Sequence, residues 1–270
     1  MPSTLRVRLQ VALTSLVLAA GVAASFAVDS GTALPQAGGR VLALIQKSSL
    51  RLEQYPSVSV QMRISVEGNG QKVSIDGSGA FDPRSRNGTF SESLPQGLGT
   101  FQAINLGSTM YAKVDPAHIA LAGGKHWVGL SVAGINQQNP GTSLGYLRIL
   151  AGAHGTVSVV GHDTIDGAAT THYRVDIDPA EAAKRVPPQF RTGPDQLAAA
   201  GIHSIPVDVW LDGSGLPRQE EIRASAHGVT SEISLHLRGS QDRLHIRAPA
   251  PADVLTVTSL ADLMPYVINR

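Results

Sequence analysis

Hydrophobic and polar residues alternate along much of the chain, most clearly over Val58–Val66. The apolar positions of this run are Val58, Val60, Met62, Ile64 and Val66. A period of two is typical of a strand with one buried face. Glu67–Gly70 then predicts a turn, and Lys72–Phe81 predicts the returning strand of a hairpin, with Val73 and Ile75 on one side.

The same reasoning predicts a long series of strands interrupted by a few short helices. The further strands are expected at Gly88–Ser93, Thr100–Leu106, Thr109–Val114, Val157–His162, Thr170–Ile177, Pro206–Leu211, Leu216–Ala224 and Val229–Leu237. Helices are expected at Arg40–Gln54, Ser143–Ala151, Pro179–Lys184, Pro194–Ala200 and Leu260–Met264. Consecutive strands predict an antiparallel meander, so the fold class is α+β, with one long sheet and helices on one of its faces. A sheet of about ten strands curls, and the apolar area of its concave face is then larger than the area that a few short helices cover.

The N-terminus predicts export. Arg6 and Arg8 are its only charges, and Leu9–Val28 has none. Ser25–Ala27 offers small residues for cleavage near Ala27, so residues 1–27 are predicted to be a signal peptide, or an uncleaved membrane anchor over residues 9–28. Residues 28–39 predict a flexible tether, and residues 40–270 a single domain.

Composition excludes several classes of function. Hydrophobic residues make up 42% of the chain, which is enough for a core. Without Arg6 and Arg8 the chain has one more acidic than basic residue, so no nucleic acid is expected as a partner. The absence of cysteine excludes disulfides, thiolate metal sites, a cysteine nucleophile and lipid attachment through a cysteine.

One motif suggests a hydrolase. Gly141–Gly145 matches the G-x-S-x-G pattern of a serine nucleophile, which needs a strand before the serine and a helix after it. Ile135–Pro140 has the composition of a loop and cannot supply that strand. A helix N-cap or loop role for Ser143 is therefore the favoured interpretation, and a hydrolase using Ser143 is the weakest of three functional hypotheses.

The remaining polar residues favour structural roles. The nine histidines fall in no metal-ligand spacing, and His236, between Leu235 and Leu237, is expected on the polar face of its strand. The aspartates near two strands could pair as in glycosidases, but turn and cap roles explain them better; they are Asp163, Asp166, Asp176 and Asp178. The glycines form no phosphate-binding loop, so no cofactor, no metal and no catalytic residue is expected. Trp127 and Trp210 are expected in the core or in a cavity wall.

Several phrases of the chain, in their order and spacing, are similar to a known family. They are Gln46–Val66, Thr109–Val114, His126–Leu130, Gly161–Asp178 and Ile205–Arg218, and they span nearly all of the predicted domain. The chain resembles the actinobacterial LppX/LprG-type cell-envelope lipoproteins, whose fold is related to the LolA-like carriers. Members usually carry a lipidated cysteine, which this chain lacks.

The resemblance implies a single large curved antiparallel sheet, a half-barrel with helices on its concave face. This half-barrel would enclose an apolar cavity for the acyl chains of a lipid or glycolipid. Such binding needs no reactive group, so the chain is expected not to be an enzyme. The candidate lipid-binding wall residues are Val58, Val60, Met62, Ile64, Val66, Val73, Ile75, Trp210, Ile233, Leu235 and Leu237. A membrane transporter or an acceptor protein is the expected partner. The alternative is an envelope interaction or sensor module with a filled core.

Overall fold

The computed structural model describes residues 48, 51–68, 70–85, 87–95, 99–114, 120–131, 155–185, 192–226, 228–258 and 267–268. The first group of strands is β1 Ser57–Gly68, β2 Gln71–Phe81, β3 Gly88–Ser93, β4 Thr100–Leu106, β5 Thr109–Val114, β6 Ala120–Leu121 and β7 Trp127–Ser131. The second is β8 Gly155–Ile165, β9 Ala168–Ile177, β10 Ile205–Asp212, β11 Pro217–Ala226, β12 Val229–Ser240, β13 Val254–Val257 and β14 Val267–Ile268. The helices are α5 Pro179–Arg185, α6 Thr192–Ala199 and the short 3-10 helices Ala122–Gly124 and Pro251–Asp253.

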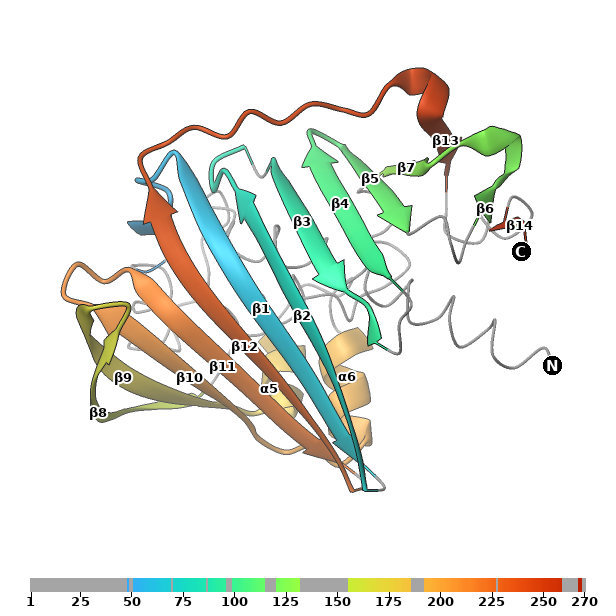
Figure 1. The fold of residues 1–270 in the computed structure, drawn as a ribbon. Coiled ribbons are helices and arrows are strands. Elements are labelled where there is room, and N and C mark those ends of the chain that lie inside the picture. The colour runs from blue at the N-terminus through green and yellow to red at the C-terminus, as the bar shows by residue number, and fades with distance from the viewer. Residues whose placement is uncertain are drawn as a thin grey trace.

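Twelve of these strands form one curved sheet (Figure 1). Their order is β13-β7-β5-β4-β3-β2-β1-β12-β11-β10-β9-β8, and β14 pairs separately with β6. Neighbouring strands are antiparallel except β13 and β7, which are parallel. The predicted fold class, a single large curved antiparallel sheet with few helices, is confirmed.

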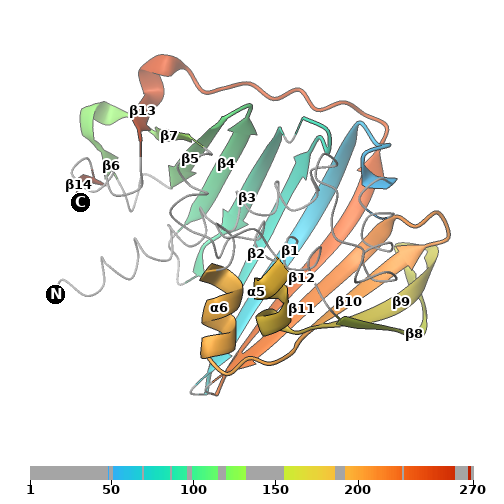
Figure 2. The same ribbon diagram turned by 180° about the vertical axis from the view of Figure 1, so that it is seen from behind.

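Both described α-helices lie on one side of the sheet, behind the strands in Figure 1 and in front of them in Figure 2. We call this side the inner face and the opposite side the outer face. Along β1 the inner face carries the buried even-numbered residues Val58–Ile64, and the outer face carries the odd-numbered polar residues.

Local signals in the sequence explain where elements turn and begin. Asp166 and Gly167 both have positive φ, 51° and 76°, as the two-residue turn between β8 and β9 requires. Asp178 caps α5, because its Oδ1 accepts hydrogen bonds from the backbone N–H of Ala180 and Glu181 at 2.8 and 3.2 Å. The predicted turn and cap roles of Asp166 and Asp178 are thus confirmed.

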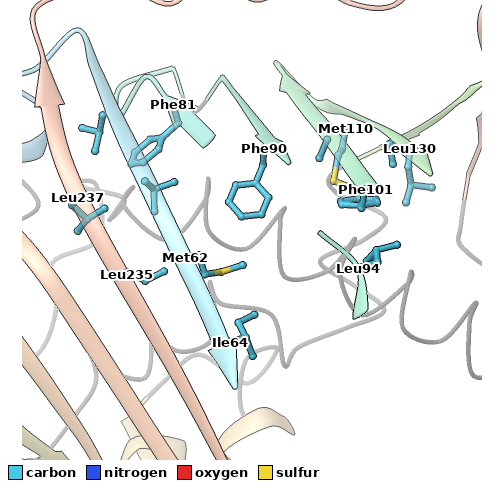
Figure 3. Packing of buried hydrophobic residues seen from close by; sticks show 14 of the residues in the cluster. Met62, Ile64, Phe81, Phe90, Leu94, Phe101, Met110, Leu130, Leu235 and Leu237 are labelled. Atoms are coloured by element: carbon cyan, nitrogen blue, oxygen red, sulfur yellow. The ribbon is translucent and has the colours of Figure 1, made fainter. Parts of the chain in front are cut away.

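The inner face is the core of the molecule. A large cluster joins β1 to the strands on both sides of it, and Figure 3 shows its side chains gathered from β1, β2, β3, β4, β5, β7 and β12. A smaller cluster, around Val175, Val207 and Ile222, lies under α5. Fully burying a side chain of this size contributes about 1.5–3 kcal/mol, so these clusters dominate the stability of the sheet.

Some elements differ from the expected ones. The short strands β6, β7, β13 and β14 were not among those predicted. The longest of them, β7, has five residues, and the parallel pairing of β13 with β7 joins distant parts of the chain. Arg51 and Leu52 are helical, as expected for the end of the helix before Tyr55-Pro56, whereas most of Arg40–Gln54 lies outside the described residues. So do the N-terminal segment 1–39 and the expected helices Ser143–Ala151 and Leu260–Met264.

Candidate functional site

Six of the eleven predicted wall residues meet in the large core cluster. Val58, Val60, Met62, Ile64, Leu235 and Leu237 are each at most 6% exposed. The register of the sheet explains their meeting, because Met62 lies opposite Leu235 and Val60 lies opposite Leu237 across the β1–β12 pair. Cross-strand neighbours on one face pack against each other, so the strand pair forms the centre of the inner face.

The same apolar rows run outward from this core towards the hairpin tips. Ile75 and Ile233 are partly buried against the core, whereas Val66 and Val73, which lie opposite each other, are 41% and 39% exposed. Val229, at the start of β12, is 41% exposed. Along β1 and β2 the inner face therefore passes from closed core to open apolar surface, whereas along β12 Ser231 separates Val229 from Ile233.

A carboxyl group interrupts this apolar face. Glu220 of β11 lies opposite Val209 on one side and Leu235 on the other, and its side chain is half-buried. No hydrogen bond or ion pair joins it to another residue in the part of the chain that the structure describes. Burial raises the pKa of Glu220 to about 7, because its charged form has lost solvent without gaining a partner.

Glu92 is a second acidic residue on the inner face. It is 1% exposed and lies opposite Phe101 on one side and Gly77 on the other. The alternation Phe90, Glu92, Leu94 could have shown this, since it places an acid at an apolar position of β3. Sequence reasoning missed both Glu92 and Glu220.

Trp210 lies on the outer face, away from the other predicted wall residues. Its indole Nε1–H donates to Asp163 Oδ2 at 2.8 Å, and its ring stacks on His172 with centroids 4.1 Å apart. His172 Nε2 lies 2.8 Å from Asp208 Oδ1, and Arg174 donates two hydrogen bonds to the same carboxylate. This polar cluster ties β8, β9 and β10 together.

The charge of Asp208 is well satisfied by this cluster. Burial by itself raises the pKa of Asp208, but hydrogen bonds from Arg174 and His172, together with their positive charge, outweigh it and hold the pKa below its ordinary value. The carboxylate therefore stabilises the folded state in its charged form.

Other predicted features have structural roles or lie elsewhere. His236 is exposed on the polar side of β12, as expected. Among the described residues no three His, Asp or Glu side chains gather as they would around a metal ion. The described helices include none with the length and apolar character needed to span a bilayer. Ser143 and its G-x-S-x-G motif lie outside the described residues.

Comparisons with known proteins give one sequence relative and several folds. No protein-family model matches the chain. A Streptomyces griseus protein, described as an uncharacterized 31.2 kDa protein in the rplA-rplJ intergenic region, is 30% identical over 158 residues, which is 52% of this chain and 51% of that protein. The chain thus spans about half the length of the curated relative that it matches.

Solved structures with a similar fold include two mycobacterial proteins. LprF from Mycobacterium bovis has a TM-score of 0.44 at 17% identity, with 78% of this chain and 97% of that chain covered. The Mycobacterium tuberculosis lipoprotein LppX has a TM-score of 0.45 at 17% identity, with 77% and 98% covered. Similarity at this level assigns no function, and membership of the LppX/LprG-type family stays a prediction.

Proposed function

We propose that this chain is an exported cell-envelope protein that binds a lipid or glycolipid by its acyl chains on the inner face of the sheet. The observation that carries the proposal is the continuity of the apolar row on β1, which passes from the packed core at Met62 and Ile64 to the open surface at Val66, with Val73 opposite it on β2. An acyl chain bound on this surface would pack against apolar side chains that continue directly from the core.

The apolar side chains of the inner face can supply the binding free energy of an acyl chain without any polar contact. Each methylene removed from water contributes about 0.8 kcal/mol, so a fatty acyl chain gains affinity from apolar side chains alone. Ile75 and Ile233 are only partly buried and lie next to the exposed valines, so they extend the wall. Val58, Val60, Leu235 and Leu237 would support it from beneath.

Export and transfer complete the proposal. The uncharged Leu9–Val28, preceded by Arg6 and Arg8, supports a signal peptide cleaved near Ala27 or an anchor over residues 9–28. A protein held at or released from a membrane could pass its lipid to a membrane transporter or an acceptor protein. The absence of cysteine means that attachment through a lipidated cysteine is not available to this chain.

Lipid uptake by paired variants tests the proposal. The double variant Val66→Asp/Val73→Asp places charges on the open apolar surface, and Ser65→Asp/Ser74→Asp is its control because that pair faces the other side, with its hydroxyls 3.2 Å apart. We expect native mass spectrometry of the purified chain to show co-purified lipid. We also expect the valine variant to weaken binding of a fluorescent fatty acid at least tenfold, and the serine variant less than twofold.

Two results would contradict the proposal. One is wild-type protein that carries no lipid and takes up neither the fluorescent fatty acid nor phosphatidylglycerol. The other is an equal loss in both double variants, which would reflect general destabilisation of the hairpin and not a lost acyl site.

The tight packing of the inner face favours a second candidate, an envelope interaction or sensor module with a filled core. Val58, Met62 and Leu237 are at most 3% exposed, so this part of the inner face holds no room for a ligand without rearrangement. This alternative predicts that the exposed valines contact a protein. Photo-crosslinking from position 73 in the native host would then yield a defined protein adduct, whereas the lipid proposal predicts adducts with lipid.

A further inference from the structure

The outer face carries a polar trough that has no part in the proposed lipid site. Its volume is about 680 Å³, within the range of ligand sites in proteins. Residues from β12, β1, β2, β3, β4 and β7 line it, together with Asp166 from the β8–β9 turn. This face is turned to the viewer in Figure 1, on the side away from α5 and α6.

Two continuous rows of outward side chains form most of the lining. Following the strand register from β12, the first row is His236, Gln61, Ser78, Ser91 and Gln102. The second row is Arg238, Ser59, Ala80, Thr89 and Ile104. Strands lie about 4.8 Å apart, so six spacings from β12 to β7 give a length of about 29 Å, which suits a linear polymer better than a small molecule.

The rows offer hydrogen-bonding groups that the protein itself does not use. Within the described residues the side chains of Gln61, Gln102, Ser78, Ser91 and Thr89 make no hydrogen bond. Amides and hydroxyls both donate and accept, as the hydroxyl groups of a sugar do. The small serines in the middle leave depth between the longer side chains, so a flat ring can approach the sheet.

The two ends of the trough differ from its middle. Trp127 lines one end with a partly exposed ring, and Lys113 Nζ lies over that ring, 5.8 Å from its centroid. Aromatic rings present an apolar face with hydrogen-bonding groups around it, which is also what a sugar ring requires. At the other end Arg238 pairs with Asp166 at 3.1 Å, so the charge of the arginine is matched within the trough.

From this lining we propose that the outer trough binds a linear, uncharged glycan, with one sugar ring on Trp127 and the following units hydrogen-bonded along the two polar rows. A nucleic acid or phosphate-rich ligand would call for several unpaired cations, whereas Arg238 is paired and Lys113, over Trp127, is a single cation. A peptide strand would seek free backbone groups, which lie at sheet edges and not on the face of paired strands such as β1 and β2. An acyl chain would meet few apolar side chains here beyond Ala80, Ile104 and Trp127.

Binding of hexasaccharides to the 270-residue chain tests this inference. The probes are cellohexaose, maltohexaose and N-acetylchitohexaose, measured by saturation-transfer NMR and isothermal titration calorimetry. Ser78→Tyr fills the middle of the trough, and Ser74→Tyr is its control on the same face of the same strand, outside the lining. Both positions are exposed, so both variants should fold like the wild type.

We expect at least one hexasaccharide to bind, and Ser78→Tyr to weaken it at least tenfold. Trp127→Ala and Gln61→Ala should each weaken it about fivefold or more, whereas Ser74→Tyr should change it less than twofold. Because the trough and the lipid site lie on opposite faces, lipid-loaded and lipid-free protein should bind equally, so failure of one proposal does not entail failure of the other. The inference is overturned if no hexasaccharide binds at millimolar concentration or if Ser78→Tyr has no effect. It is also overturned if phosphatidylglycerol vesicles bind in a way that Ser78→Tyr abolishes.

Discussion

Ile64 of β1 lies directly opposite Ile233 of β12, and Ile75 of β2 lies opposite Ile64 on its other side. This row of isoleucines crosses the seam where β1, the first strand among the described residues, meets a strand from the C-terminal part of the chain. Because β1 and β12 pair over their whole length, the seam makes one sheet of two strand groups. The core, the proposed lipid surface and the outer trough all depend on it.

Shortening a side chain at this seam should destabilise the fold strongly. Ile64 is 6% exposed, and Ile64→Ala should lower the free energy of unfolding by roughly 2–4 kcal/mol, through lost burial and an unfilled cavity. Val66→Ala, two residues along the same face but 41% exposed, should lower it by about 0.5 kcal/mol. Urea denaturation measures both, and equal losses would show that the seam is no better packed than the tip.

The charged carboxylate of Asp208 should stabilise the polar cluster that ties β8, β9 and β10 together on the outer face. Asp208→Asn removes the charge that Arg174 and His172 contact, and should cost roughly 2 kcal/mol at neutral pH. The matched change Asp76→Asn, in the exposed pair with Arg63, should leave stability nearly unchanged.

The effect at Asp208 should depend on pH in a defined direction. Its folded pKa lies below the ordinary value of 3.8, so its stabilisation is present above that value and is lost as the pH falls through the folded pKa. The difference between wild type and Asp208→Asn should therefore shrink below about pH 4. A difference that stays constant down to pH 2 would show that the charge is not what stabilises the cluster.

Glu220 should act in the opposite direction. Its pKa is raised from 4.5 to about 7, so the folded state holds the proton more firmly than the unfolded state, and stability is lost as the pH rises through this interval. Glu220→Gln should be more stable than wild type at pH 8 by up to about 3 kcal/mol, and little different at pH 4. Glu221→Gln, whose side chain is turned to the other face and accepts from Gln219, is the control and should lack this trend.

Gly239 should be needed for the approach of Tyr55 to the end of β12. A Cβ at position 239 would lie 2.5 Å from ring atoms of Tyr55, so Gly239→Ala must displace the ring and should destabilise by roughly 1–3 kcal/mol. At Gly213 a Cβ would meet nothing within 4 Å, so Gly213→Ala should be close to neutral. Thermal unfolding compares the two, and a neutral Gly239→Ala would show that Tyr55 does not pack there in solution.

The sequence by itself determined the long strands, because a strand with one buried face alternates apolar and polar residues along consecutive positions. Val58–Val66 placed β1 with its inner side, Asp166-Gly167 placed a hairpin turn, and Asp178 placed the start of α5. These features depend on neighbours in the chain, and so they could be predicted before any contact was known.

Only the tertiary structure decided which strands become neighbours and what each face then offers. Pairing of β1 with β12 and of β7 with β13 joins residues that no local pattern links, and it buries Met62 while leaving Val66 open. The same pairing isolates Glu220 among apolar residues and aligns Gln61 with Ser78 and His236 along one trough. Such sites arise where side chains from distant strands are brought together, and their chemistry therefore belongs to the fold and not to any one segment of the sequence.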